Sequence, residues 1–282
     1  KGTYRFSNES IQVEWVQHVS DYCVNGQAII VNLGIEELFF YNEKEIEQLK
    51  TCRKTLKQWE SSIFTDITVK SAQMMLIIRS QSLNIPDFIN TFEGKFPLLK
   101  EREIITKTIE NEGARQEVIE DKWEFAGSLY PAVKGMPLWK TKETLIDEIG
   151  PIVFDPYYAV RQEELYDQER EKKFMVKCYM WFSPKLSHCG IHNNHNYIEI
   201  HTQISGFGRI PKFLEKDVST VYEDNRMAPG HTLSEAFCRI IEDNTKPQEI
   251  DFVYPWHEYY SDTDCIWLVS EFHPVDDPTN AV

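Results

Sequence analysis

The sequence predicts an α+β protein, with a mainly helical region over residues 1–122 and an antiparallel β-barrel or jelly roll over residues 123–282. Two observations support this division. Between residues 42 and 111, apolar side chains recur at steps of three and four, as on one buried helix face. From Trp123 on, short aromatic and β-branched runs alternate with Pro and Gly turns. That second pattern is typical of a sandwich or barrel.

The first predicted helix begins at Asn42, with Glu45 as its capping-box partner. Its buried face is predicted from a spaced apolar set: Ile46, Leu49, Leu56, Trp59 and Ile63. A second helical segment covers residues 68–83 and a third covers residues 98–119. Before them, Asn25-Gly26 stands between two apolar stretches, which predicts a β-hairpin within residues 11–40.

The strands of the second half are expected at 123–130, 152–160, 174–182, 197–204, 250–254 and 265–272. Each is a short run rich in aromatic or β-branched residues between turn signals. A charged stretch over residues 161–173 interrupts the series and is expected to be a solvated helix or loop. The number and spacing of these runs favour an antiparallel barrel over a parallel sheet with crossover helices.

Composition excludes some functions. The formal net charge of the 282 residues is −15, and nucleic-acid backbones are bound by clustered Lys and Arg, so we expect no nucleic-acid partner. No apolar run approaches the roughly 20 residues of a membrane-spanning helix, so no membrane span is expected. The six cysteines are scattered without a CxxC pair. They indicate reduced thiols in a cytoplasmic protein rather than a disulfide framework.

Seven of the eight histidines lie between His188 and His273. On a strand, alternate residues share a face, so one face would hold a polar row: His195, Tyr197, Glu199, His201 and Gln203. The other face would be an apolar core face: Ile198, Ile200, Thr202 and Ile204. Buried in a barrel, the polar row would be costly to desolvate unless its groups paired with each other, with a ligand or with a metal. Imidazole and carboxylate groups are usual ligands of zinc, iron, manganese and nickel.

One strand cannot complete a coordination sphere, and His257 in Tyr254-Pro255-Trp256-His257 is the predicted second contributor. These residues resemble the two cupin motifs. His195, Glu199 and Gly206 match the later part of the first motif, while His192 lies three residues before His195 instead of two. Pro255-Trp256-His257 resembles the second motif. A weaker resemblance links His195 to Gly206 with YhcH-type sugar-metabolism proteins, which are small double-stranded β-helix proteins.

The cupin resemblance implies that His192, His195, Glu199 and His257 hold one divalent metal, either Fe, Mn, Ni or Zn. It further suggests an enzyme that acts on a small polar metabolite, a sugar or a carbonyl acid, by oxygenation, isomerisation or hydrolysis. His201 and Tyr197 are then the predicted catalytic residues, because an imidazole exchanges protons near neutrality. Gln203 and Trp256 are predicted to bind substrate.

Other interpretations of the same residues remain open. His192 and His195 could lie in a solvated turn, Glu199 on the surface, His201 against a cross-strand partner and His257 in a packed aromatic corner. The alternative function is a non-catalytic protein that binds or senses a small ligand, with a helical region for interaction or oligomerisation. A homodimer is the expected assembly if the protein self-associates.

Overall fold

The computed structural model describes residues 1–7, 11–42, 54–80, 123–127, 138–141, 146–183, 185–242 and 250–275. In these parts the chain is built mostly of β strands, and the only α-helix there is the four-residue α3 (Pro156–Ala159). The prediction of a mainly helical N-terminal region is therefore wrong. None of the helices in the described ranges has the length and apolar character needed to cross a bilayer.

The N-terminal part forms one five-stranded sheet in the order β1-β2-β5-β3-β4. Its strands are β1 (Gly2–Thr3), β2 (Ile11–Asn32), β3 (Leu38–Tyr41), β4 (Lys54–Leu56) and β5 (Ser61–Ser80). The long strands β2 and β5 form an antiparallel ribbon that coils on itself. Residues 75–78 of β5 pair with residues 13–16 on one side and with residues 29–32 on the other.

This coiling explains why part of β5 resembles a helix in the sequence. Along residues 74–78, alternate side chains enter two different cores: Met74, Leu76 and Ile78 enter one, and Met75 and Ile77 enter the other. A strand buried on both faces shows no polar alternation, so its sequence is a continuous apolar run. Such a run does not distinguish a strand from a buried helix.

The predicted first helix is wrong over its described part, residues 54–63, for a related reason. Leu56 ends β4, Trp59 lies in the following turn with φ 63°, and Ile63 belongs to β5. Their helix-like spacing therefore spans a chain reversal. At Asn25-Gly26, β2 continues through a register shift, with Gly26 at φ 73°, instead of reversing as a hairpin. Strand structure around it is confirmed.

Other N-terminal predictions fall outside the described residues. These are the capping box that joins Asn42 to Glu45, and the helix over residues 98–119. The proposed boundary between residues 122 and 123 stays a prediction.

The C-terminal part is antiparallel β structure, as predicted. Its strands are β6 (Trp123–Gly127), β7 (Leu138–Thr141), β8 (Glu148–Phe154), β9 (Lys172–Ser183), β10 (Ile198–Ser205), β11 (Gly208–Phe213), β12 (Val221–Met227), β13 (Arg239–Glu242), β14 (Ile250–Val253), β15 (Trp256–His257), β16 (Tyr260–Ser261) and β17 (Cys265–Pro274). One sheet has the order β10-β17-β9-β7-β6, with β8 also on β9. A second sheet has the order β12-β11-β15, with β16 on β11.

The strand expected over residues 152–160 ends early. Asp155 accepts hydrogen bonds from the backbone N–H groups of Tyr157 and Tyr158, and Pro156 occupies the first turn, so α3 begins there. This is a favourable helix start, because the cap satisfies free N–H groups and proline fixes a helical φ. The charged stretch that follows holds a short 3-10 turn (Gln168–Arg170) before β9 begins.

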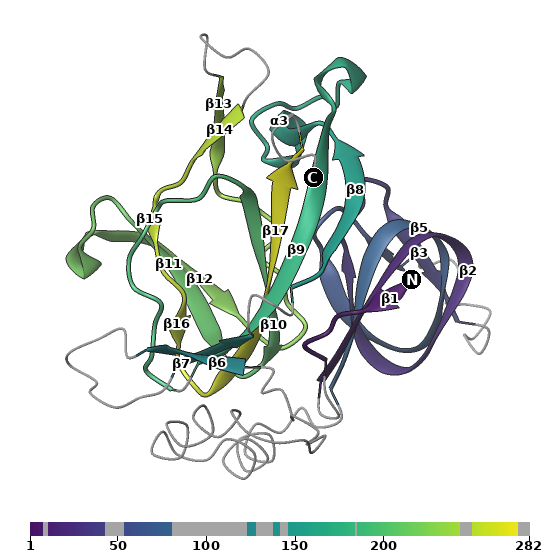
Figure 1. Cartoon of the computed structure of the whole chain (residues 1–282), viewed down its shortest axis with the longest axis horizontal. Helices are drawn as coiled ribbons and strands as arrows, with labels where there is room; N and C mark the ends of the chain where they lie inside the picture. The colour runs from purple at the N-terminus through teal and green to yellow at the C-terminus, as the bar shows by residue number, and fades with distance from the viewer. Residues whose placement is uncertain are drawn as a thin grey trace, which may run out of the picture.

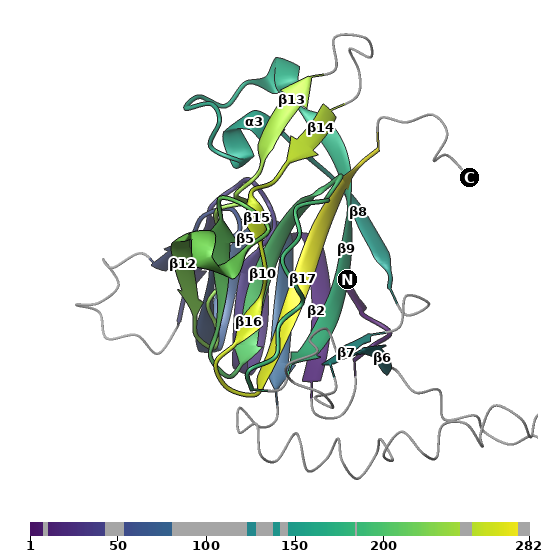
Figure 2. The same ribbon diagram turned by 90° about the vertical axis from the view of Figure 1, so that its left-hand side faces the viewer.

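The outer face of the larger C-terminal sheet packs against the N-terminal sheet. Figures 1 and 2 show the coiled ribbon of β2 and β5 beside β8, β9 and β17. Trp59 joins the two parts, because its ring lies 6.0 Å from the ring of Phe154 and 5.4 Å from that of Phe272. A single apolar core therefore includes side chains from both halves of the chain.

The inner face of the same sheet is different. Along β10, Ile198, Ile200 and Ile204 enter the shared core, whereas Glu199 and His201 point to the other side, as the alternation predicts. Along β17, Trp267 and Val269 likewise face inward and join a smaller core with residues of the opposite sheet. The polar row of β10 thus lines the barrel interior.

Candidate metal centre

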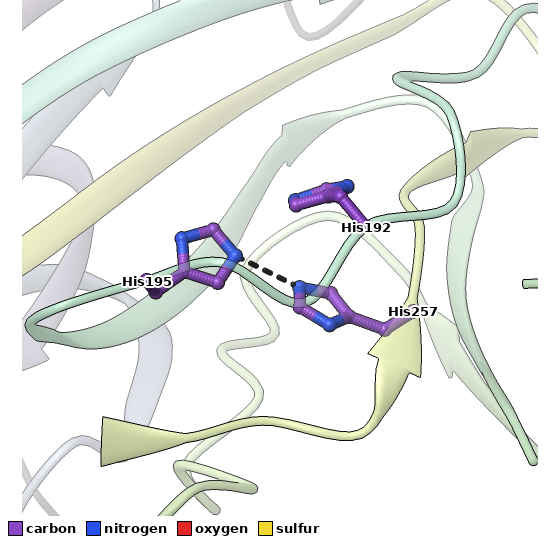
Figure 3. Close-up of side chains that lie close together, drawn as sticks. All are labelled: His192, His195 and His257. Atoms are coloured by element: carbon purple, nitrogen blue, oxygen red, sulfur yellow. Dashed lines mark hydrogen bonds between the residues drawn. The ribbon is translucent and has the colours of Figure 1, made fainter. Parts of the chain in front are cut away.

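Three histidines from two distant segments of the chain meet in the C-terminal part. One ring nitrogen from each of His192, His195 and His257 lies within 4.8 Å of the others. Figure 3 shows the three rings turned toward one another, with His257 on β15 and the other two on the segment that leads into β10. The predicted meeting of His195 with His257 is therefore found in the structure.

The backbone fixes this meeting. The N–H of His192 donates to the carbonyl of His257, and the N–H of His257 donates to the carbonyl of His192, both at 2.9 Å. This isolated β-bridge holds the two Cα atoms opposite each other. It explains why a segment without regular structure can present His192 in a defined position.

Hydrogen bonds also set the ring orientations. Nδ1 of His192 lies 2.7 Å from the carbonyl of Gly190, and Nδ1 of His257 lies 2.9 Å from that of Pro255. A carbonyl only accepts, so each Nδ1 carries the proton and each Nε2 keeps its lone pair. Metal-binding histidines are typically oriented by such a contact from the second ring nitrogen.

The rings are shielded from water. The ring of Phe237 lies 4.8 Å from that of His257, and the ring of Tyr254 lies 4.8 Å from that of His195. Burial, together with the nearby His192, lowers the pKa of His257 to about 3. Burial also lowers the pKa of His195. Both imidazoles are therefore neutral near pH 7, which is the state that binds a metal ion.

The donor set fits a divalent metal. Nε2 of His195 lies 3.2 Å from Nε2 of His257, and two nitrogens that are each about 2.1 Å from one metal are roughly 3 Å apart. The widest separation in the group, up to 4.8 Å, exceeds the limit of about 4.2 Å that two such bonds allow. Binding of one ion by all three nitrogens would therefore require the rings to move closer together.

Glu199 lies beside the three histidines. Its Oε1 is 2.7 Å from Nε2 of His201, and its Oε2 is 3.7 Å from Nδ1 of His195. Burial alone would raise the pKa of Glu199, but His201 and the other histidines outweigh it, and the pKa is held below its usual range. In this arrangement the carboxylate accepts from His201. It lies on the Nδ1 side of the His195 ring, away from the Nε2 atom that faces His257. Its predicted role as a metal ligand stays a prediction.

The other predicted site residues differ in position. Tyr197 lies next to the cluster, with its Oη 3.3 Å from Nδ1 of His195. Gln203 is fully buried, where its amide donates to the carbonyl of Ser205 at 2.7 Å and its oxygen accepts from Tyr259 at 2.7 Å. Trp256 lies under the ammonium group of Lys216 at 5.7 Å. As the neighbour of His257 on a strand, it points to the opposite side.

Tyr254 is a site residue that the pattern analysis did not assign. Its hydroxyl accepts from the backbone N–H of Glu199 and donates to the carbonyl of Tyr197, both at 2.9 Å. It thus ties the segment that carries His257 to the start of β10. Its position three residues before His257 could have indicated a place near the site. Its hydrogen-bond partners lie more than fifty residues away in the chain, so the sequence alone did not reveal them.

The fold and the three histidines together define an antiparallel β protein with a candidate metal centre in its C-terminal part. No protein-family model and no curated protein sequence matches the chain. Three similar solved structures illustrate its likeness to known folds. A conserved Streptococcus pyogenes protein of unknown function is 16% identical with a TM-score of 0.24, over 35% of this chain and 65% of that one.

An RmlC-like cupin from Desulfovibrio desulfuricans is 14% identical with a TM-score of 0.23, over 34% of this chain and 70% of that one. An oxalate oxidase in complex with the substrate analogue glycolate is 12% identical with a TM-score of 0.25, over 36% and 43%. The match thus spans less than two thirds of the first and third of these chains. An RmlC-like cupin is among these three structures, whereas no YhcH-type protein is among them. These values establish no shared family.

Proposed function

We propose that the protein is a metal-dependent enzyme that acts on a small polar metabolite at this histidine cluster. His192, His195 and His257 would hold one divalent ion, either Fe, Mn, Ni or Zn, with Glu199 as the candidate fourth ligand. The observation that carries the proposal is the convergence of one ring nitrogen from each of three histidines. In His192 and His257, a backbone carbonyl accepts from Nδ1, so the lone pair is on Nε2.

A bound divalent metal would polarise a substrate oxygen. The chain's own groups around it are suited to positioning and proton handling. His201 is buried and its Nε2 donates to Glu199, while its Nδ1 has no hydrogen-bond partner within the described residues. Tyr197 presents its hydroxyl to His195 at the edge of the site. These two residues are the proposed catalytic groups.

The geometry lends less support to the proposed substrate-binding residues. The amide of Gln203 already bonds to the carbonyl of Ser205 and the hydroxyl of Tyr259, so its role would be to hold Tyr259 in position. Trp256 points away from His257, and its predicted contact with substrate has no support from its position.

Metal analysis of the purified protein tests the proposal. We expect close to one equivalent of Fe, Mn, Ni or Zn, lost in His195→Ala and in His257→Ala. His18→Asn is the matched control, because His18 is exposed on β2 and asparagine tolerates its φ of 48°. The proposal fails if the wild-type protein binds none of the four ions when each is supplied. It also fails if both alanine variants keep full metal content.

A further inference from the structure

A cavity of about 480 Å³ lies on the inner side of the larger C-terminal sheet, and His273 is among its lining residues. Side chains from β7, β8, β9 and β17 line it, together with Tyr197. Its volume lies within the range of pockets that hold small metabolites. The proposed catalytic machinery accounts for only one of its lining residues, Tyr197.

Aromatic rings form one wall of the cavity. Tyr179 and Trp181 both point inward from β9, on the face opposite the core residues Cys178 and Met180. The ring of Trp181 is stacked on that of Trp267 at 5.5 Å, with 7° between the planes. This stacking fixes the indole, so the wall offers a rigid, flat, apolar surface to a ligand.

A buried carboxylate adds a charged hydrogen-bond acceptor to this apolar wall. Glu271 accepts from the hydroxyl of Tyr179 at 2.7 Å and pairs with Nε2 of His273 at 2.8 Å, with only 7% of its surface exposed. It is thus held as a fixed acceptor at the cavity wall. A ligand hydroxyl can donate to such a carboxylate in a strong, charge-assisted hydrogen bond.

A partly exposed lysine in the cavity lining supplies a cation. Nζ of Lys177 lies 2.8 Å from a carboxylate oxygen of Glu148, and the two side chains are 32% and 52% exposed. An exposed pair of this kind contributes about 0–1 kcal/mol. Lys177 can therefore exchange Glu148 for a ligand carboxylate at little cost. The cavity thus combines a cation, a fixed acceptor and a flat apolar wall.

Tyr197 joins this cavity to the histidines. Its ring lies 4.6 Å from that of His273 inside the cavity, and its hydroxyl lies 3.3 Å from Nδ1 of His195. A molecule in the cavity would therefore lie one side chain away from the candidate metal centre. The inference rests on the proposed function, because it assigns the cavity as the substrate-binding site of the proposed enzyme.

We propose that the cavity binds a sugar acid of monosaccharide size. Its carboxylate would pair with Lys177, its hydroxyls would donate to Glu271, and the C–H face of its ring would lie on Trp181. A sugar acid supplies all three complementary features in one molecule. A simple dicarboxylate would lack the hydroxyl donors, and a neutral sugar would leave Lys177 with Glu148.

Titration calorimetry with D-glucuronate tests this inference on the full chain, both stripped of metal by a chelator and loaded with Zn or Mn. We expect saturable binding in both forms, and binding of D-glucose that is weaker by about tenfold, the loss of one charged contact. Lys177→Met should weaken D-glucuronate binding by about tenfold and leave D-glucose binding unchanged. Lys173→Met, an exposed lysine on the same strand, is the matched control and should bind like the wild type.

The outcomes separate this inference from the proposed function. If the protein binds no metal but binds D-glucuronate through Lys177, the metal proposal fails and the sugar-acid site stands. If the wild-type protein does not bind D-glucuronate in either form, the inference is overturned whatever its metal content. It is also overturned if Lys177→Met and Lys177→Gln, both shown to be folded by circular dichroism, bind D-glucuronate as tightly as Lys173→Met.

Discussion

Nε2 of His195 lies 3.2 Å from Nε2 of His257, although 62 positions separate the two residues in the chain. The Nδ1 proton of His257 is directed to the carbonyl of Pro255, so its Nε2 presents a lone pair. If His195 presented a second lone pair, the two nitrogens would repel each other at this distance. Either a proton or a metal ion between them removes the repulsion, which is why this pair is central to the proposed site.

Metal binding should raise thermal stability. At a free metal concentration 100 times its Kd, a ligand that binds only the folded state stabilises it by about 2.7 kcal/mol. For a chain of this size the Tm should rise by roughly 5–10 °C. Calorimetric melting with chelator and then with added Zn or Mn measures the shift. His257→Ala should show no shift, and a shift of wild-type size in that variant would argue against the site.

Cysteine alkylation should follow burial. Burial raises the pKa of Cys178 to about 11 and that of Cys189 and Cys238 to about 12. The reactive thiolate forms only as pH rises through the pKa, so these three should stay unlabelled by iodoacetamide at pH 8. Exposed Cys23 should react under the same conditions. Peptide mapping before and after denaturation measures this. Rapid labelling of Cys189 in the folded protein would contradict the prediction.

Replacement of Trp59 should destabilise the whole protein. Its side chain is 1% exposed and packs on Phe154 and Phe272, so Trp59→Ala would leave a large cavity between the two sheets. The expected loss in the free energy of unfolding is about 3–5 kcal/mol. Urea denaturation measures it, with Leu214→Ala as the control because Leu214 is 72% exposed. Equal stability of the two variants would refute the shared core.

Gly208 should not tolerate a side chain. A Cβ atom at this position would overlap the hydroxyl end of Tyr259, which donates to Gln203 at 2.7 Å inside the barrel. Gly208→Ala would displace the tyrosine and lower the free energy of unfolding by about 1–3 kcal/mol. Phe207→Ala is the neighbouring control, since Phe207 is 56% exposed. Thermal melting of both variants tests this, and a Tm of Gly208→Ala equal to that of the control would contradict it.

The sequence predicted the arrangement of the candidate site better than it predicted the fold of the N-terminal part. The alternation along β10 depends only on strand geometry, so the inward placement of Glu199 and His201 follows from local pattern. The contact between His195 and His257 was inferred from residue types that share one chemistry. In contrast, the apolar run at residues 74–78 lies between two cores, and only tertiary structure distinguishes that from a helix.

Long-range partners account for what the sequence did not reveal at the site. Glu271 and Tyr179 meet across two strands that are 92 positions apart in the chain. Each of them alternates with ordinary core residues and carries no motif. Tyr254 is similar, because it contributes to the site through two hydrogen bonds from its hydroxyl to the backbone at the start of β10. Side chains of this kind become recognisable only when the strand pairing is known.

The apolar core shared by the two halves has a consequence for how the protein can be divided. The outer face of the larger C-terminal sheet is covered by side chains of β2 and β5, among them Val13, Ile29 and Leu76. A fragment that starts at Trp123 would leave that face open to water and would self-associate or fail to fold. The C-terminal part therefore depends on its contacts with the N-terminal sheet for a stable fold, and we expect neither half to be stable when it is expressed alone.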